Sequence, residues 1–135
     1  MTEGKGQIVI MLDESTPVLA GSPFLQRGYQ VIYHKDVLPP GASDPVVVAT
    51  AILNKAILIA VDGDIKRMAK RFGAPDLSEK FKSLDLIFID CNEVLAAKRL
   101  EHAMSFIENE WKVVCKKKAR RLWLSIGPHK LTSFR

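Results

Sequence analysis

Apolar residues along this chain gather into short unbroken runs that are separated by amphipathic stretches. The runs at 8–12, 30–37, 56–61 and 84–90 predict strands, and several of them are continuous enough to be covered on both faces. The stretches between them carry apolar residues at helical spacing. Parallel strands need long crossovers, so this alternation predicts an α/β fold with a mainly parallel sheet flanked by helices. We expect a single domain over 1–135.

The helices are predicted from their first residues. After the first strand, Thr16 and Pro17 are suited to be the N-cap and first position of a helical or broken helical segment. Asp44 and Pro45 are a similar pair and open a predicted helix over 44–55. Its expected inner face consists of Val47, Val48, Ala51 and Ile52.

The second half of the chain contains the longest predicted helix, over 92–111. A shorter helix is expected at 65–72, capped by Asp64. Two strands at 112–115 and 121–126 are predicted to form a C-terminal β-hairpin over about 112–127. The inner stripe expected on the longest helix is Val94, Ala97, Leu100, Met104, Ile107 and Trp111.

Composition narrows the class of protein. Apolar residues make up 47% of the chain and charged residues 26%, an ordinary balance for a globular protein. No apolar run approaches the roughly 18 residues that a membrane span needs, and no leader is recognisable. Cys91 and Cys115 form no CxxC pair. We therefore expect a cytoplasmic protein with reduced cysteines and no membrane contact.

The net charge of +5 is unevenly distributed. Residues 1–111 hold 12 basic and all 15 acidic residues, whereas 112–135 hold 8 basic residues and no acid. The densest part, "KKKARR" at 116–121, lies between Trp111 and Trp123. Basic residues beside aromatic rings suit nucleic-acid phosphates and bases, but a solvated basic turn explains the run as well.

Acidic residues follow the predicted parallel strands. Asp13 and Glu14 come after the first strand, Asp62 and Asp64 come after the third, and Asp44 opens the helix that leads into the third. The carboxyl ends of parallel strands share one edge of a sheet, and ligands bind at that edge. We therefore expect these carboxylates to lie near one another.

Local structure explains some of these acids. Asp44 and Asp64 are good N-caps. Asp13 and Asp62 are surplus, because Thr16 and Asp64 already serve the helices that follow them. Two carboxylates about 4 Å apart repel by roughly 4 kcal/mol at an effective dielectric of 20. A divalent cation such as Mg²⁺ or Mn²⁺ would offset this repulsion.

The segments "MLDESTP" and "GASDPVVVATAILNKAILIAVDGDI" resemble the PIN-like nucleases, in particular a short subgroup related to toxins of toxin–antitoxin pairs. The likeness covers about residues 8–72. It implies a three-layer PIN-like fold and a ribonuclease that hydrolyses RNA phosphodiester bonds with Mg²⁺ or Mn²⁺. By motif position, the catalytic and metal-binding residues would be Asp13, Asp44 and Asp62.

The resemblance also implies the surroundings of the site and the partners. Glu14 and Asp64 would hold the metal ligands in position. RNA is the implied partner, together with a possible cognate antitoxin protein, and a homodimer is expected. The basic residues expected to contact the RNA backbone are Lys66, Arg67, Lys116, Lys117, Lys118, Arg120 and Arg121.

Two other functions stay open. The family usually has a hydroxyl residue at the position of Ala60 and an aromatic one at Ile65, so a catalytically silent module that binds nucleic acid or a protein is an alternative. A phosphatase of the haloacid dehalogenase type also has Asp-x-Asp after a strand, but here "VDGDIKR" enters a helix at once. His34, His102 and His129 are scattered and are predicted to be non-catalytic.

Overall fold

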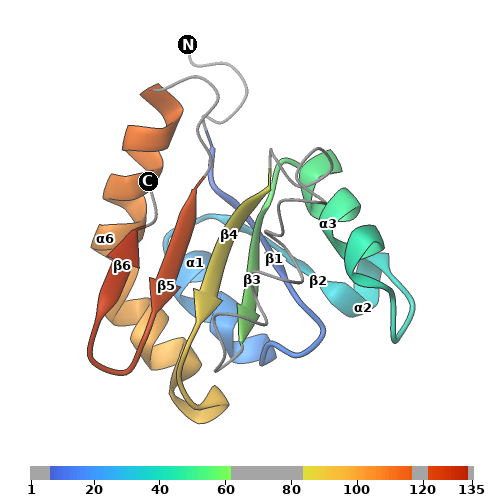
Figure 1. Ribbon diagram of the computed structural model, residues 1–135, viewed down its shortest axis with the longest axis horizontal. Helices are drawn as coiled ribbons and strands as arrows, with labels where there is room; N and C mark the ends of the chain where they lie inside the picture. The colour runs from blue at the N-terminus through green and yellow to red at the C-terminus, as the bar shows by residue number, and fades with distance from the viewer. Residues whose placement is uncertain (1–6, 62–83, 117–121, 134–135) are drawn as a thin grey trace.

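Figure 1 shows the computed structural model of the protein, which describes residues 7–61, 84–116 and 122–133. Six strands form one sheet in the order β2-β1-β3-β4-β5-β6. The first five strands are parallel, and β6 is antiparallel to β5. The strands are β1 Val9–Leu12, β2 Gln30–Tyr33, β3 Ile57–Val61, β4 Asp85–Ile89, β5 Trp123–Ile126 and β6 Leu131–Ser133.

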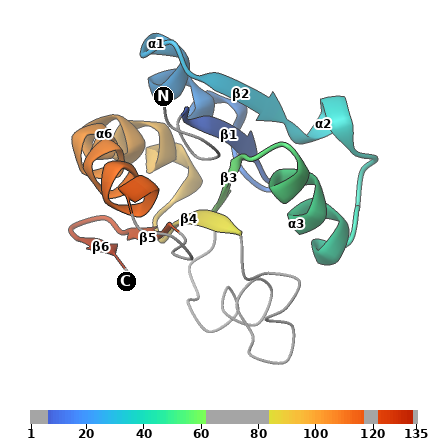
Figure 2. The same ribbon diagram turned by 90° about the horizontal axis from the view of Figure 1, so that it is seen from above.

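Helices cover both faces of the sheet. They are η1 Val18–Gly21, α1 Ser22–Gln26, α2 His34–Val37, α3 Asp44–Leu53 and α6 Glu93–Lys116. Figure 2 shows α1 and α6 on one side of the sheet and α3 on the other. The predicted α/β class, with a mainly parallel sheet flanked by helices, is confirmed.

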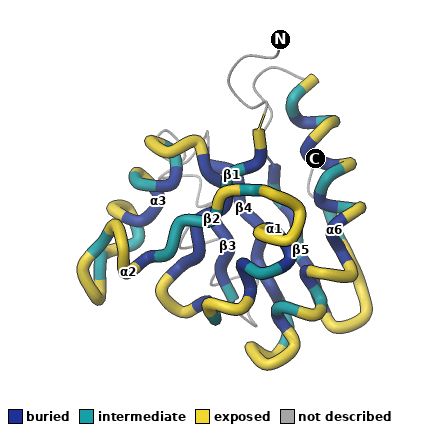
Figure 3. Tube along the Cα trace, turned by 180° about the vertical axis from the view of Figure 1, so that it is seen from behind, coloured by how far each residue is buried: buried dark blue, intermediate teal, exposed yellow. Residues whose placement is uncertain are grey.

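The central strands are apolar without interruption because they are buried on both faces. In β3, Ile57 and Ile59 belong to the core that includes α1 and α6, whereas Leu58 and Ala60 belong to the core that includes α3. All four side chains are fully buried. The buried strands stand out in Figure 3 beneath exposed loops and helix faces. Two apolar cores therefore hold the three layers together.

The starts of two predicted helices are displaced by one residue. The N-cap of η1 is Pro17, and Thr16 instead donates its hydroxyl to the Ile59 carbonyl oxygen at 2.9 Å. The N-cap of α3 is Ser43, so Asp44 is the first helical residue rather than the cap. The prediction of a broken helical segment after β1 is confirmed, since η1 gives way to α1.

The second strand is shorter than predicted. β2 ends at Tyr33, and residues 34–37 form α2. The N–H of Leu38 donates to the His34 carbonyl oxygen at 2.9 Å, which closes a helical turn where the prediction continued the strand. His34 is therefore the first residue beyond the carboxyl end of β2.

The predicted C-terminal hairpin over 112–127 is wrong. Residues 112–116 continue α6, because Val114 extends the buried helical stripe that includes Trp111. The stripe also begins later than predicted, since Val94 is 85% exposed. β5 pairs in parallel with β4, and the antiparallel pair at this end is β5 with β6.

The sheet topology creates one position suited to a ligand. The chain moves from β1 outward to β2, and then returns to place β3 on the other side of β1. The strand order therefore reverses at β1, and open α/β sheets bind ligands at the carboxyl ends of the strands beside such a reversal. Asp13 follows β1 at this point, and Asp62 is the residue after β3 in the sequence.

No helix in the described ranges has both the length and the apolar character required to cross a bilayer.

Candidate functional site

Asp13 lies at the carboxyl edge of the sheet and is only 5% exposed. Its N–H donates to the Ile59 carbonyl oxygen of β3 at 2.9 Å, which extends the β1–β3 pairing one residue past the strand. Its Oδ2 accepts a hydrogen bond from the Ser15 hydroxyl at 3.1 Å. The backbone bond to β3 therefore fixes the position of Asp13, and the hydrogen bond from Ser15 orients its carboxylate.

The turn after Asp13 is anchored to β3. The N–H of Thr16 donates to the Asp13 carbonyl oxygen at 2.9 Å. The buried Thr16 hydroxyl donates to the same Ile59 carbonyl oxygen that Asp13 uses. These bonds explain why a threonine stands here although it caps no helix. It fixes the turn that presents the Asp13 carboxylate.

Glu14 connects this turn to the loop that precedes α3. Its carboxylate accepts hydrogen bonds from the Gly41 N–H, with N···O distances of 3.0 and 3.3 Å. Gly41 has a φ of +73°, a left-handed conformation that favours glycine. The Gly41 N–H is therefore directed at Glu14 by a backbone conformation that is strained for residues other than glycine. Glu14 thus ties together the segments that carry Asp13 and Asp44.

Asp13 and Asp44 line one small pocket of about 260 Å³. We call it the acidic pocket. Asp13 reaches it from the end of β1, and the half-buried Asp44 reaches it from the first turn of α3. The residues lining it are Asp13, Glu14, Ser15, His34, Ala42 and Asp44. Two of the three acids predicted to act together therefore share a pocket.

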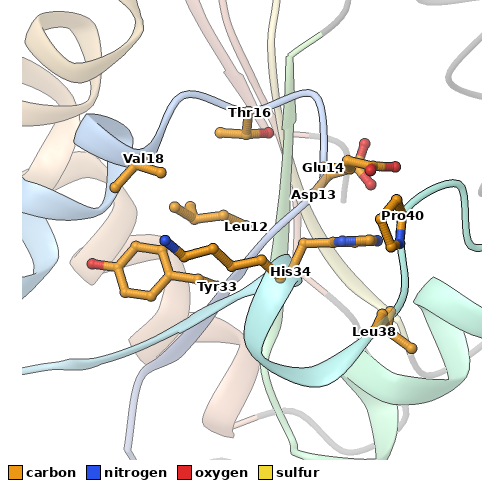
Figure 4. A pocket seen from close by; sticks show the side chains of 10 residues that line it. Leu12, Asp13, Glu14, Thr16, Val18, Tyr33, His34, Leu38 and Pro40 are labelled. Atoms are coloured by element: carbon orange, nitrogen blue, oxygen red, sulfur yellow. The ribbon is translucent and has the colours of Figure 1, made fainter.

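A second pocket of about 280 Å³, which we call the tyrosine pocket, shares Asp13, Glu14 and His34 with the acidic pocket. Tyr33 and Val18 lie at its other side (Figure 4). The remaining lining residues are Leu12, Thr16, Lys35, Leu38 and Pro40. The two pockets therefore meet at the turn that follows β1.

His34, which the sequence predicted to be non-catalytic, lines both pockets. It is 7% exposed, and its Nε2 is buried with no hydrogen-bond partner among the described residues. In Figure 4 its side chain extends past the Asp13–Glu14 turn toward Pro40. The sequence could have indicated this role only through the end of the second strand, because His34 directly follows Tyr33. The predicted strand over 30–37 instead placed His34 in the middle of a strand.

The third predicted acid, Asp62, lies outside the described residues. The same holds for Asp64 and for most of the basic residues expected to contact RNA. These are Lys66, Arg67, Lys117, Lys118, Arg120 and Arg121. Their roles stay predictions.

Lys116, the first residue of the basic run, is exposed at the end of α6. α6 follows β4 and leads toward the start of the parallel β5, so its last turn lies at the amino edge of the sheet, opposite Asp13 (Figure 1). The strands separate the two edges by about 17 Å, the length of five residues, and Lys116 lies from the acidic pocket at a distance of that order.

The two tryptophans that flank the run are not open stacking surfaces. Trp111 is 4% exposed and belongs to the core. Trp123 is half-buried, and its indole N–H donates to the Leu84 carbonyl oxygen at 3.1 Å. The expected stacking platform of Trp111 beside "KKKARR" is therefore wrong. Burial of apolar surface accounts for Trp111 instead.

Cys91 is the other reactive side chain at the carboxyl edge, directly after the loop residue Asp90. Neither Cys91 nor Cys115 forms a disulfide among the described residues. Burial raises the pKa of Cys91, and the nearby Arg99 only partly opposes this. A thiol with a raised pKa is a weak nucleophile at neutral pH. Cys91 is therefore a poor candidate for covalent catalysis.

The donor chemistry of the acidic pocket suits a hard cation. Asp13 and Asp44 supply carboxylate oxygens from separate elements, and Mg²⁺ is bound by one or two carboxylates while it keeps several waters. Within 7–61, 84–116 and 122–133, no group of three or more His, Cys, Asp or Glu side chains is arranged around a metal position. Asp13 and Asp44 are therefore the described residues that could hold such a cation, and Asp62 is the predicted third.

The fold and the pockets define an α/β protein with carboxylates at the switch point of a parallel sheet. No protein-family model, curated protein or solved structure was found to match this chain.

Proposed function

We propose that this protein is a metal-dependent ribonuclease of PIN-like type, which hydrolyses RNA phosphodiester bonds at the acidic pocket. The observation that carries the proposal is the meeting of Asp13 and Asp44 in one pocket at the reversal of strand order. They are 31 residues apart in sequence and belong to different elements. A purely capping role for each would not require a shared pocket.

The burial of Asp13 supports the same proposal. A buried carboxylate is costly unless it is paired, hydrogen-bonded or bound to a cation. The Ser15 hydroxyl donates to Asp13, and Glu14 and Asp44 bring further negative charge into the same pocket. Mg²⁺ or Mn²⁺ compensates such a cluster, and when bound it polarises a phosphate and acidifies water.

The chain's own residues have distinct tasks in this proposal. Asp13 and Asp44 hold the cation, with Asp62 as the predicted third ligand. Glu14 keeps the two carboxylate-bearing segments together through the Gly41 N–H. Thr16 and Ser15 restrict the Asp13 turn, so that its carboxylate need not reorganise when substrate arrives.

RNA is favoured as substrate by the charge distribution. The segment 112–135 holds 8 basic residues and no acid, and polynucleotide binding depends on such charge. Lys116, the first residue of the basic run in this segment, lies at the edge opposite Asp13. A chain of several nucleotides, rather than a mononucleotide, would reach both. An antitoxin partner and a homodimer remain expectations from the PIN-like resemblance.

The test is cleavage of a labelled single-stranded RNA by the purified chain with Mg²⁺, with Mn²⁺ and with a chelator. We expect cleavage with either cation and none with the chelator, because the pocket acts through the bound metal. p-Nitrophenyl phosphate serves as a monoester control. Hydrolysis of the monoester alone would favour a phosphatase of the haloacid dehalogenase type.

RNA binding without cleavage under all three conditions would favour a catalytically silent module. A chain that neither binds nor cleaves RNA would contradict the proposal.

A further inference from the structure

His34 is a buried side chain whose hydrogen bonding is incomplete. The residue is 7% exposed, and its Nε2 has no hydrogen-bond partner among the residues that the structure describes. Buried polar atoms are nearly always hydrogen-bonded, because losing water without gaining a partner costs free energy. An unpartnered atom in such a place therefore calls for a functional explanation.

The neighbouring polar side chains of the site, by contrast, have hydrogen-bond partners. The buried Thr16 hydroxyl donates to Ile59, and the Ser15 hydroxyl donates to Asp13. Glu14 accepts from the Gly41 N–H. The hydrogen bonding that shapes the site is thus supplied without the His34 imidazole. His34 is not needed to fix the turn that presents Asp13.

His34 is also well placed to meet a bound group. It lines both the acidic pocket, with Asp13 and Asp44, and the tyrosine pocket, with Tyr33 and Lys35. Figure 4 shows its side chain passing beside the Asp13–Glu14 turn. A phosphate held by a cation at the acidic pocket would therefore lie beside an imidazole that can donate a hydrogen bond.

We infer that His34 contacts the substrate and donates a hydrogen bond from Nε2 to a non-bridging oxygen of the phosphodiester in the acidic pocket. This inference rests on the proposed function. An imidazole with its proton on Nε2 donates to an anionic oxygen, and burial strengthens the bond by excluding competing water. Its role is substrate binding, and the cation is held by the carboxylates.

Contact with Nε2 requires a small movement of the pocket wall, because the atom is buried. Lys35 and Pro40 line the tyrosine pocket and are exposed. Exposed side chains can shift without losing buried contacts. The wall next to His34 can therefore open while the β1 turn stays fixed.

The test compares His34→Leu, which removes the donor, with His34→Gln, which keeps an N–H donor. The probe is fluorescein-labelled hexauridylate, titrated by fluorescence anisotropy with Ca²⁺ to slow turnover. We expect His34→Leu to weaken binding about 10-fold to 100-fold, as loss of a hydrogen bond to a charged group does. His34→Gln should stay within a few-fold of wild type.

Two further measurements separate binding from structure. Mg²⁺ affinity by calorimetry should be unchanged in both variants. The melting temperature of His34→Leu should be equal or higher, because a buried unpartnered nitrogen is replaced by an apolar side chain. His102→Leu, at an exposed position of α6, is the matched control and should leave binding unchanged.

Three results would overturn the inference. Equal binding by His34→Leu and wild type would exclude the contact. A lowered melting temperature in both variants, with equal loss of binding, would make His34 structural. Loss of Mg²⁺ affinity would make it a metal ligand.

The same experiments distinguish failure of this inference from failure of the proposed function. Wild type that binds without cleaving RNA would refute hydrolysis but leave the His34 comparison valid. Wild type that does not bind would refute both.

Discussion

The two edges of the sheet differ in how their polar groups are arranged: at the amino edge they pair with one another, and at the carboxyl edge acidic groups lie together. At the amino edge, the Tyr29 hydroxyl donates to the Glu108 carboxylate, which also pairs with Arg27 at 3.0 Å. This edge has the larger pocket, about 470 Å³ against about 260 Å³ for the acidic pocket. At the carboxyl edge, carboxylates share the acidic pocket with His34, whose buried Nε2 has no hydrogen-bond partner among the described residues.

The comparison shows that pocket size is a poor guide to chemistry in this fold. The amino-edge groups neutralise or hydrogen-bond one another between the α1–β2 turn and α6, as expected of a contact that holds elements together. The carboxyl-edge acids concentrate like charge where the strand order reverses. Acidic side chains that share a pocket at such a position are candidates for a functional site.

The largest expected effect is that of Asp13→Asn. Removing the charge should lower Mg²⁺- or Mn²⁺-dependent RNA cleavage by about 10²–10³-fold, as loss of one essential electrostatic group does. The melting temperature without metal should stay the same or rise, because a member of an acidic cluster is neutralised. Glu108→Gln at the amino edge is the control and should leave cleavage unchanged.

A purely structural Asp13 predicts the opposite pattern. Its loss would lower stability by about 1 kcal/mol through the hydrogen bond with Ser15. Metal binding measured by calorimetry would then be unaffected. A destabilised Asp13→Asn variant with full metal affinity would therefore refute the metal site.

The basic run should give the next largest effect. Neutralising Lys116, Lys117, Lys118, Arg120 and Arg121 together should weaken RNA binding and reduce the slope of log K against log salt by up to about 3.5, at roughly 0.7 per lost phosphate contact on single strands. The measurement is anisotropy over a range of salt concentrations. An unchanged slope would identify the run as solvated surface.

Gly41 tests the connection between the two acid-bearing segments. Gly41→Ala should cost about 1–2 kcal/mol because alanine is strained at a φ of +73°. Gly28, with a φ of +82°, lies before β2 at the amino edge, and a Cβ added at either glycine meets no atom within 4 Å. Gly28→Ala should therefore cost a similar amount of stability, measured by chemical denaturation.

Cleavage should separate these two variants. Gly41 donates to Glu14 beside the acidic pocket, whereas Gly28 does not line it. We expect Gly41→Ala to reduce cleavage several-fold and Gly28→Ala to leave it unchanged. Equal losses of activity would show that the effect is one of general stability.

The smallest effect concerns the amino edge. The hydrogen bond to Glu108 is the main cause that raises the pKa of Tyr29 above its usual value. A raised folded pKa means that the phenol contributes stability at neutral pH, and that this contribution is lost as pH rises through the folded value. Tyr29→Phe should therefore lower stability by less than about 1 kcal/mol at pH 7, since the pair is partly solvated.

The pH dependence checks the cause. The difference between Tyr29→Phe and wild type should shrink in melts above about pH 10, where the wild-type phenol ionises. A difference that persists at high pH would show that packing of the Tyr29 ring, rather than its hydroxyl, is responsible.

The sequence alone determined the fold class and the edge at which its acids gather. Strands such as Ile57–Val61 are predictable because burial on both faces demands an unbroken apolar run. The carboxyl ends of parallel strands must share an edge, so Asp13 could be assigned to that edge from its place after a strand. Local pattern was sufficient for both conclusions.

Tertiary structure decided the element ends and the roles of particular side chains. "KVVC" at 112–115 has the composition of a strand, but it continues α6, and Val114 is buried in the core as part of the last turn of that helix. Thr16 fits a helix cap in sequence, yet the Ile59 carbonyl 43 residues away is its partner. Long-range contacts override local propensity in such places.

His34 is the clearest case of what only the fold could show. In sequence it is one of three scattered histidines, and no spacing connects it to Asp13 or Asp44. The pairing of β2 beside β1 brings His34 into the pockets that these acids line. Whether its Nε2 has a partner depends on every side chain packed around it, and that packing exists only once the sheet has formed.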